Sequence, residues 1–216
     1  IVMTETALRL LVASGACDEA KVRVVPHGAP ARLTMRAARR GDERPMAAPS
    51  PEPFRLDVPE ETLDDLTARL ERTRWPDEIP GSDWRYGSNL AYVQRLVERW
   101  RDGFDWRAQE AELNAFAQYR VQLGGIDLHF VHEPGVGPDP TPLLLVHGWP
   151  GSVWEFHDLI PRLTDPARFG GDPEDAFTVV APSLPGYTLS YRPGQPRFDV
   201  RQIGDLFAEL MTDVLG

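Results

Sequence analysis

A short apolar run that ends abruptly in a turn, residues 141–152, constrains the fold of this chain more than any other segment. It reads Thr-Pro-Leu-Leu-Leu-Val-His-Gly-Trp-Pro-Gly-Ser, and apolar residues with helical spacing follow it at Val153, Phe156, Ile160 and Leu163. A buried strand followed at once by a turn and a helix is typical of an α/β sheet. The backbone N–H groups of such a turn can stabilise a developing negative charge, as an oxyanion hole does.

Three helical patterns precede residue 119. The first is predicted to end at Trp75–Pro76, because the residue before a proline is disfavoured in a helix. The second is predicted to begin at a cap supplied by Ser88 or Asn89, and the third runs from about Asp105 to Phe116. We expect most of the tryptophans to be core or arm-anchoring residues, namely Trp75, Trp84, Trp100, Trp106 and Trp154.

The pattern becomes alternating after residue 119. It predicts a β-hairpin between Val121 and His132, with its turn at Gly124–Gly125. A second buried strand is predicted at Phe177–Ala181, and Asp199 is placed to cap an amphipathic helix. Because the chain ends where another strand is expected, the order of elements predicts an α/β fold with an incomplete sheet, preceded by a helical N-terminal arm.

Residues 1–45 differ from the rest of the chain in charge. They hold eight basic and five acidic residues, a balance of +3, whereas the whole chain carries −10. We expect residues 1–52 to be a disordered or spurious extension and a proline-marked linker, with Met46 as the natural start. The helical arm is then expected at 53–118 and the sheet-containing core at 119–216.

Composition excludes several classes of function. The net charge of −10 argues against nucleic acid as a partner, because phosphates would be repelled. Cys17 is the only cysteine, so no intrachain disulfide can form. No stretch reaches the roughly 18–20 apolar residues that span a bilayer, so we expect no membrane span and a cytoplasmic location.

The turn after the first buried strand contains the candidate site residues. His147 is either a ligand or base, or a structural residue that holds the turn. The structural role is favoured, because no carboxylate or cysteine lies at metal-ligand spacing from it, and no metal is expected. Trp149 is either a core aromatic residue or a backbone N–H donor with its indole lining a pocket. Its place in the turn favours the donor, and Pro150 fixes the adjacent backbone.

A nucleophile elbow is the other part that hydrolytic chemistry of this kind requires. The sequence contains neither Gly-x-Ser-x-Gly nor Gly-x-Asp-x-Gly. The similar segment Gly170-Gly171-Asp172 precedes Pro173 in polar surroundings, without an apolar strand before it. We therefore interpret it as a loop.

These motifs together resemble the N-terminal part of the microsomal-type epoxide hydrolases of the α/β-hydrolase superfamily. Residues 147–152 and 182–187 in the core carry the resemblance, but the His-Gly-x-Pro turn alone is shared by several α/β-hydrolase families. Arg74-Trp75-Pro76 and Asp105-Trp106-Arg107 in the arm make the combination specific. The resemblance implies that the Trp149 N–H contributes to an oxyanion hole. It also implies that His147, Gly148 and Pro150 form its scaffold, and that Trp149, Pro150 and Tyr187 lie at the substrate.

The resemblance further implies a reaction. An aspartate attacks the epoxide to form an ester, and a histidine oriented by an acid activates the water that hydrolyses the ester to a vicinal diol. All three groups are expected beyond Gly216, so this chain alone is expected to be an inactive fragment. No cofactor is implied. The partner is a small-molecule epoxide, and a homodimer of the full-length enzyme is compatible with the family.

Two alternatives remain open at the level of sequence. In the first alternative, the parent enzyme is another α/β-hydrolase, such as a haloalkane dehalogenase or an esterase. The missing residue at the elbow decides between these chemistries. An aspartate there favours epoxide or halide chemistry, and a serine favours an esterase. The other alternative is a non-catalytic interaction module whose helical arm packs on a partner.

Overall fold

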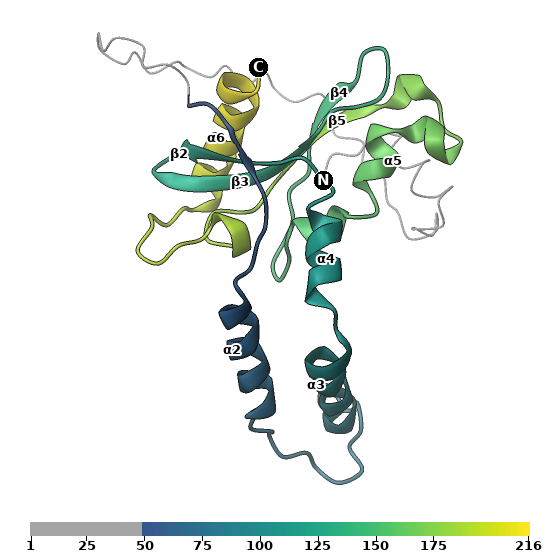
Figure 1. Ribbon diagram of the computed structural model, residues 1–216, viewed down its shortest axis with the longest axis vertical. Helices are drawn as coiled ribbons and strands as arrows, with labels where there is room; N and C mark the ends of the chain where they lie inside the picture. The colour runs from purple at the N-terminus through teal and green to yellow at the C-terminus, as the bar shows by residue number, and fades with distance from the viewer. Residues whose placement is uncertain (1–48) are drawn as a thin grey trace. The chain divides into compact units, whose positions relative to one another are not determined.

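The computed structural model describes residues 49–216, which form two compact units (Figure 1). One unit contains the described residues up to Phe54 together with Ala117–Gly216, and it holds the sheet. The other, Arg55–Phe116, is helical. The expectations for residues 1–45 lie outside the described residues.

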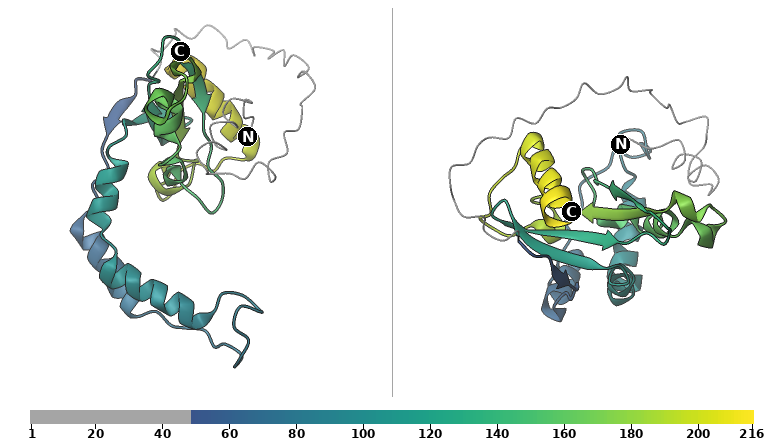
Figure 2. Two further views of the ribbon diagram at one scale, coloured as in Figure 1. Left: turned by 90° about the vertical axis from the view of Figure 1, so that its right-hand side faces the viewer. Right: turned by 90° about the horizontal axis from the view of Figure 1, so that it is seen from above.

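The sheet has five strands in the order β1-β2-β3-β5-β4 (Figure 2). Three neighbouring pairs are antiparallel, and only β4 and β5 run parallel. Among the described residues, β4 has a hydrogen-bonded neighbour on one side only. Helices and a mixed sheet confirm the predicted α/β class. The strands are β1 (Glu52–Phe54), β2 (Gln118–Leu123), β3 (Ile126–Glu133), β4 (Thr141–Leu144) and β5 (Phe177–Pro182).

Helix α6 (Val200–Glu209), which continues as a π-helical turn over Leu210–Val214, covers one face of the sheet. Leu206 and Phe207 are buried there against a set of apolar side chains from the hairpin, including the fully buried Phe130. Full burial of one such side chain contributes about 1.5–3 kcal/mol. Asp199 caps the helix as predicted, since its carboxylate accepts from the N–H of Gln202 at 2.8 Å.

The prolines near residue 50 do not mark a linker throughout, because Glu52–Phe54 form strand β1 beside β2. Pro53 is tolerated there because β1 is an edge strand, where one side of the backbone needs no ladder hydrogen bond. Short edge strands of three residues carry too little alternation to be recognised from sequence.

The single helix expected after Ser152 is also interrupted. A 3-10 turn covers Val153–Phe156, and α5 follows as a separate short helix at Ile160–Thr164. Pro161 lies at the start of α5 and has no N–H to donate to the preceding turn, which breaks a continuous helix at that point.

The helical unit contains α2 (Glu60–Glu71), α3 (Leu90–Gly103) and α4 (Trp106–Leu113). The Asn89 side chain caps α3 by accepting from the N–H of Tyr92 at 2.9 Å. Helix α2 ends before the predicted Trp75–Pro76, because the Thr73 hydroxyl donates to the carbonyl of Leu70 at 2.8 Å and so satisfies the last turn.

Of the two expected roles of the tryptophans, core or arm-anchoring, the core role is wrong for most of them. Trp75, Trp84, Trp100 and Trp154 are exposed, and Trp106 is partly buried. Periodicity locates an apolar face on a helix, but it does not say whether another element covers that face.

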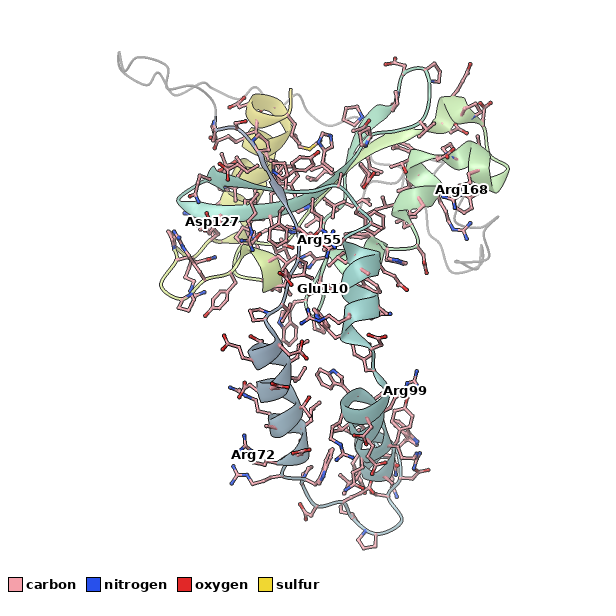
Figure 3. The ribbon with its side chains drawn as sticks, in the orientation of Figure 1. Arg55, Arg72, Arg99, Glu110, Asp127 and Arg168 are labelled. Carbon is pink, nitrogen blue, oxygen red and sulfur yellow. The ribbon has the colours of Figure 1, made fainter. Side chains whose placement is uncertain are left out.

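Glu110 connects the start of the helical unit to α4 (Figure 3). Its nearly buried carboxylate accepts from the Val58 N–H at 2.8 Å, from the Trp106 indole at 3.2 Å and from the Arg107 guanidinium at 2.8 Å. The hydrogen bond from Val58 is the main cause that lowers the pKa of Glu110, and Arg107 and Trp106 add to it. The carboxylate is therefore the acceptor that joins two segments 52 residues apart.

Replacing Glu110 by alanine should destabilise the chain by about 1–3 kcal/mol, because the Val58 N–H and the indole N–H lose their acceptor. Urea unfolding followed by tryptophan fluorescence measures the loss. Glu98→Ala on the exposed side of α3 serves as the matched control and should cost much less. Equal unfolding midpoints for the two variants would contradict this role.

Candidate functional site

The parallel pair of strands brings two turns together at its carboxyl end. Leu144 lies opposite Val180, and the N–H of Leu145 donates to the carbonyl of Val180 at 2.9 Å. The segments that leave the two strands, residues 146–152 and 183–187, therefore meet at one edge of the sheet. Crevices at the carboxyl ends of parallel strands are where open α/β sheets bind ligands.

His147 connects these two turns. Its Nε2 accepts from the N–H of Leu184 at 3.0 Å, and its Nδ1 lies 3.0 Å from the carbonyl oxygen of Gly148. A carbonyl can only accept, so Nδ1 carries the proton and the buried imidazole is neutral. The Tyr187 ring packs edge-on against it, with 5.5 Å between the ring centroids. His147 thus links the two turns, residues 146–152 and 183–187, through one hydrogen bond at each ring nitrogen.

Trp149 lies at the tip of the first turn. The residue is 81% exposed, and its peptide bond to Pro150 is cis. Within residues 49–216 its backbone N–H donates to no acceptor, in neither the sheet nor a helix. A free N–H group beside the exit of a parallel strand is a donor that an anionic oxygen can use.

The turn continues through Gly151 into a capped 3-10 segment. The Glu155 carboxylate accepts from the N–H of Ser152 at 3.3 Å, and the Ser152 hydroxyl accepts from the N–H of Trp154 at 3.3 Å. A Cβ atom on Gly151 would collide with Oε1 of Glu155. Glycine is therefore the residue that lets this capping arrangement approach the turn.

A buried polar cluster that the sequence pattern does not indicate lies next to the second turn. It is centred on the fully buried His129 of β3, with Gln118 of β2 and Ser183 and Ser190 after β5, all buried. Burial, with a smaller effect of the Arg120 charge, lowers the pKa of His129 to about 3. Alternation with Leu128 and Phe130 places His129 on the other face, which sequence alone predicts to be polar and solvated.

One hollow in the described structure does not lie at this edge of the sheet. It has a volume of about 430 Å³ and lies in the helical unit between Trp75 and Val93. Trp149, Pro150 and Tyr187, which are expected to lie at the substrate, do not line it.

No group of three or more His, Cys, Asp and Glu side chains in residues 49–216 is arranged to hold a metal ion. None of the helices there has the length and apolar character needed to cross a membrane.

Comparison with family models gives two matches that overlap at the first turn. Residues 51–156 match the model described as epoxide hydrolase N terminus, and residues 141–214 match the α/β hydrolase fold. The segment that belongs to both matches contains His147, Trp149 and Ser152.

Curated relatives and solved structures carry related descriptions. The chain is 50% identical over 159 residues to a Stigmatella aurantiaca protein described as an epoxide hydrolase, covering 74% of this chain and 36% of that one. It is 38% identical to epoxide hydrolase 1 of Oryctolagus cuniculus, with the same coverages. The structure of Aspergillus niger epoxide hydrolase matches with a TM-score of 0.66 and 34% identity, over 77% of this chain and 44% of that one. The chain thus spans little more than a third of the length of these curated relatives.

Proposed function

We propose that this chain, which belongs to the epoxide hydrolase family of the α/β-hydrolase superfamily, supplies the arm and one half of the oxyanion hole of an enzyme that converts epoxides to vicinal diols. The observation that carries the proposal is the unpaired N–H of Trp149 at the exit of β4, inside the segment that both family models match. His147 and Gly148 support the turn that presents this donor, and Tyr187 lines the neighbouring turn.

The chemistry proceeds in two steps. A carboxylate oxygen attacks an epoxide carbon, the carbon–oxygen bond of the ring breaks, and the released alkoxide takes a proton, which leaves an ester. Water, deprotonated by a general base, then attacks the carbonyl carbon of that ester and releases the diol. Negative charge develops on the carbonyl oxygen in the second step, and the Trp149 N–H stabilises it there.

The nucleophile, the acid and the base match no residue of the sequence, which lacks the elbow pattern. The 216-residue chain alone should therefore give no turnover of an aryl epoxide such as styrene oxide. Turnover above background by this chain would contradict the assignment of the nucleophile to a segment outside it.

The proposal is tested with the longest protein that the reading frame of this sequence encodes, in H₂¹⁸O. The diol of a single turnover should contain no ¹⁸O, because its new oxygen comes from the carboxylate, and label should enter the diol over repeated turnovers. Mass spectrometry of the diol measures this. Label in the first diol would indicate direct attack by water, and no diol at all would contradict epoxide hydrolysis.

The proposal extends to the partner, the location and the assembly of the enzyme. We propose a small-molecule epoxide as its partner, no nucleic acid, a cytoplasmic location and a homodimer of the full-length protein. Cell fractionation and sedimentation of that protein test location and assembly separately from catalysis.

A further inference from the structure

We propose that His129 is a positioning residue for the proposed reaction: it fixes the segment Ser183–Ser190 and thereby keeps His147 in the tautomer that holds the oxyanion turn. The inference rests on the proposed function only for its catalytic consequence. The hydrogen bonds that carry it are a property of the folded chain.

His129 holds both ends of this segment. Its backbone carbonyl accepts from the Ser183 N–H at 2.9 Å, and its backbone N–H donates to the Ser190 hydroxyl at 2.9 Å. Its ring contacts Oγ of Ser183 at 3.0 Å through Nδ1 and Oε1 of Gln118 at 2.9 Å through Nε2. Oε1 of Gln118 only accepts, so Nε2 donates to it and the Ser183 hydroxyl donates to Nδ1.

Ser190 extends the same network back toward the turn. Its carbonyl accepts from the Gly186 N–H at 3.1 Å and from the Gln195 side chain at 3.0 Å. Its N–H donates to the carbonyl of Tyr187 at 2.8 Å. The loop is thus tied to His129 at both ends, through Ser183, which contacts its ring and its carbonyl, and through Ser190, which accepts from its backbone N–H.

Leu184 connects this hydrogen-bond network to His147 in the candidate site. It follows Ser183 directly, and its N–H donates to Nε2 of His147. That bond requires an unprotonated Nε2, and it therefore places the proton of His147 on Nδ1, facing the carbonyl of Gly148. If the segment after β5 shifts, Nε2 loses its donor and both tautomers of His147 become accessible.

The test is the tautomer of His147, read from its two ring nitrogen shifts in the ¹⁵N-histidine-labelled chain near pH 7.5. The wild-type chain should show the Nδ1–H form alone. Ser183→Ala removes the hydroxyl that links His129 to Leu184, and it should give a mixture of tautomers and at least tenfold faster hydrogen exchange at the Leu184 amide. Ser183→Thr keeps the hydroxyl and should restore the single form.

Leu128→Ala is the matched control, because Leu128 lies next to His129 on β3 but packs on the α6 side of the sheet. It should lower stability without changing the His147 tautomer. A single unchanged tautomer in folded Ser183→Ala would overturn the proposal. If that variant does not fold, Ser190→Ala takes its place under the same criterion.

Activity of the longer protein separates the two proposals. If the wild-type protein hydrolyses epoxides, Ser183→Ala should lower kcat about tenfold or more with little change in KM, and an unchanged kcat would overturn the positioning role. If the wild-type protein hydrolyses none, the proposed function fails, while the tautomer measurement still decides the role of His129.

Discussion

The free energy of unfolding should fall steeply as the pH drops from about 6.5 toward 3, and His129 should account for most of the fall. Burial, with Arg120 nearby, lowers the pKa of His129 to about 3 in the folded chain, against 6.5 for the free side chain. Between these values the unfolded chain binds a proton that the folded chain does not bind. Stability is therefore fully present above pH 6.5 and is lost as the pH falls, by up to about 4–5 kcal/mol.

The groups around His129 either add to the loss of stability at low pH or leave it unchanged. The Ser183 hydroxyl and the Gln118 amide do not titrate, and the charge of Arg120 disfavours protonation of His129. Burial also lowers the pKa of the half-buried His132 on the same strand, so His132 adds a smaller acid-dependent loss. The carboxylate of Glu110, whose pKa is lowered, contributes only at the acid end of the range.

Urea unfolding of the chain at several pH values between 7.5 and 4 measures this effect. His129→Gln keeps an acceptor and a donor but cannot become a cation. It should be less stable than the wild type at pH 7.5 and should lose much less stability on acidification. Parallel curves for the two proteins would show that another group controls the acid response.

Replacing His147 by alanine in the longer protein should lower kcat by roughly 10²–10³, with a much smaller effect on KM. This is the range expected when one donor of an oxyanion hole is displaced. His147 bonds to both turns, so without it the Trp149 N–H, which we propose as the oxyanion donor, loses its fixed position. A loss confined to kcat indicates an interaction made in the transition state.

Steady-state kinetics on styrene oxide measure this loss, with circular dichroism to show that each variant is folded. His157→Ala is the matched control, since His157 belongs to the following segment and its ring stacks on Trp154, outside the turn. It should retain near wild-type kcat. A folded His147→Ala enzyme with unchanged kcat would remove His147 and its turn from the mechanism.

Local patterns predicted the local structure well. Four predicted features that depend on residues a few positions apart are all present. They are the Gly124–Gly125 turn, the caps at Asn89 and Asp199, and the strand that ends at the first turn. The break at Pro161 was also visible in the sequence, but the apolar spacing across it suggested one helix. In this case, the covalent restriction of proline outweighed periodicity.

The buried cluster could not be predicted in this way. His129 bonds to residues 54 and 61 positions later in the chain, and it is buried because the loop after β5 covers that face of the sheet. The exposed Trp84 and Trp100 show the converse, since strongly apolar residues remain uncovered within the described part. Which face becomes covered is decided by long-range packing, and periodicity carries no information about it.

The outer side of β4 has a practical consequence for anyone who expresses this polypeptide. Its main-chain donors and acceptors face no strand of the described chain. Leu143 and Leu144 of β4, and Leu145 directly after it, are only partly covered. Such a rim is a template for any extended peptide, including a second molecule of the same polypeptide. Yield and monodispersity should therefore decline as its concentration rises, and a charged substitution along this rim is the first remedy to try.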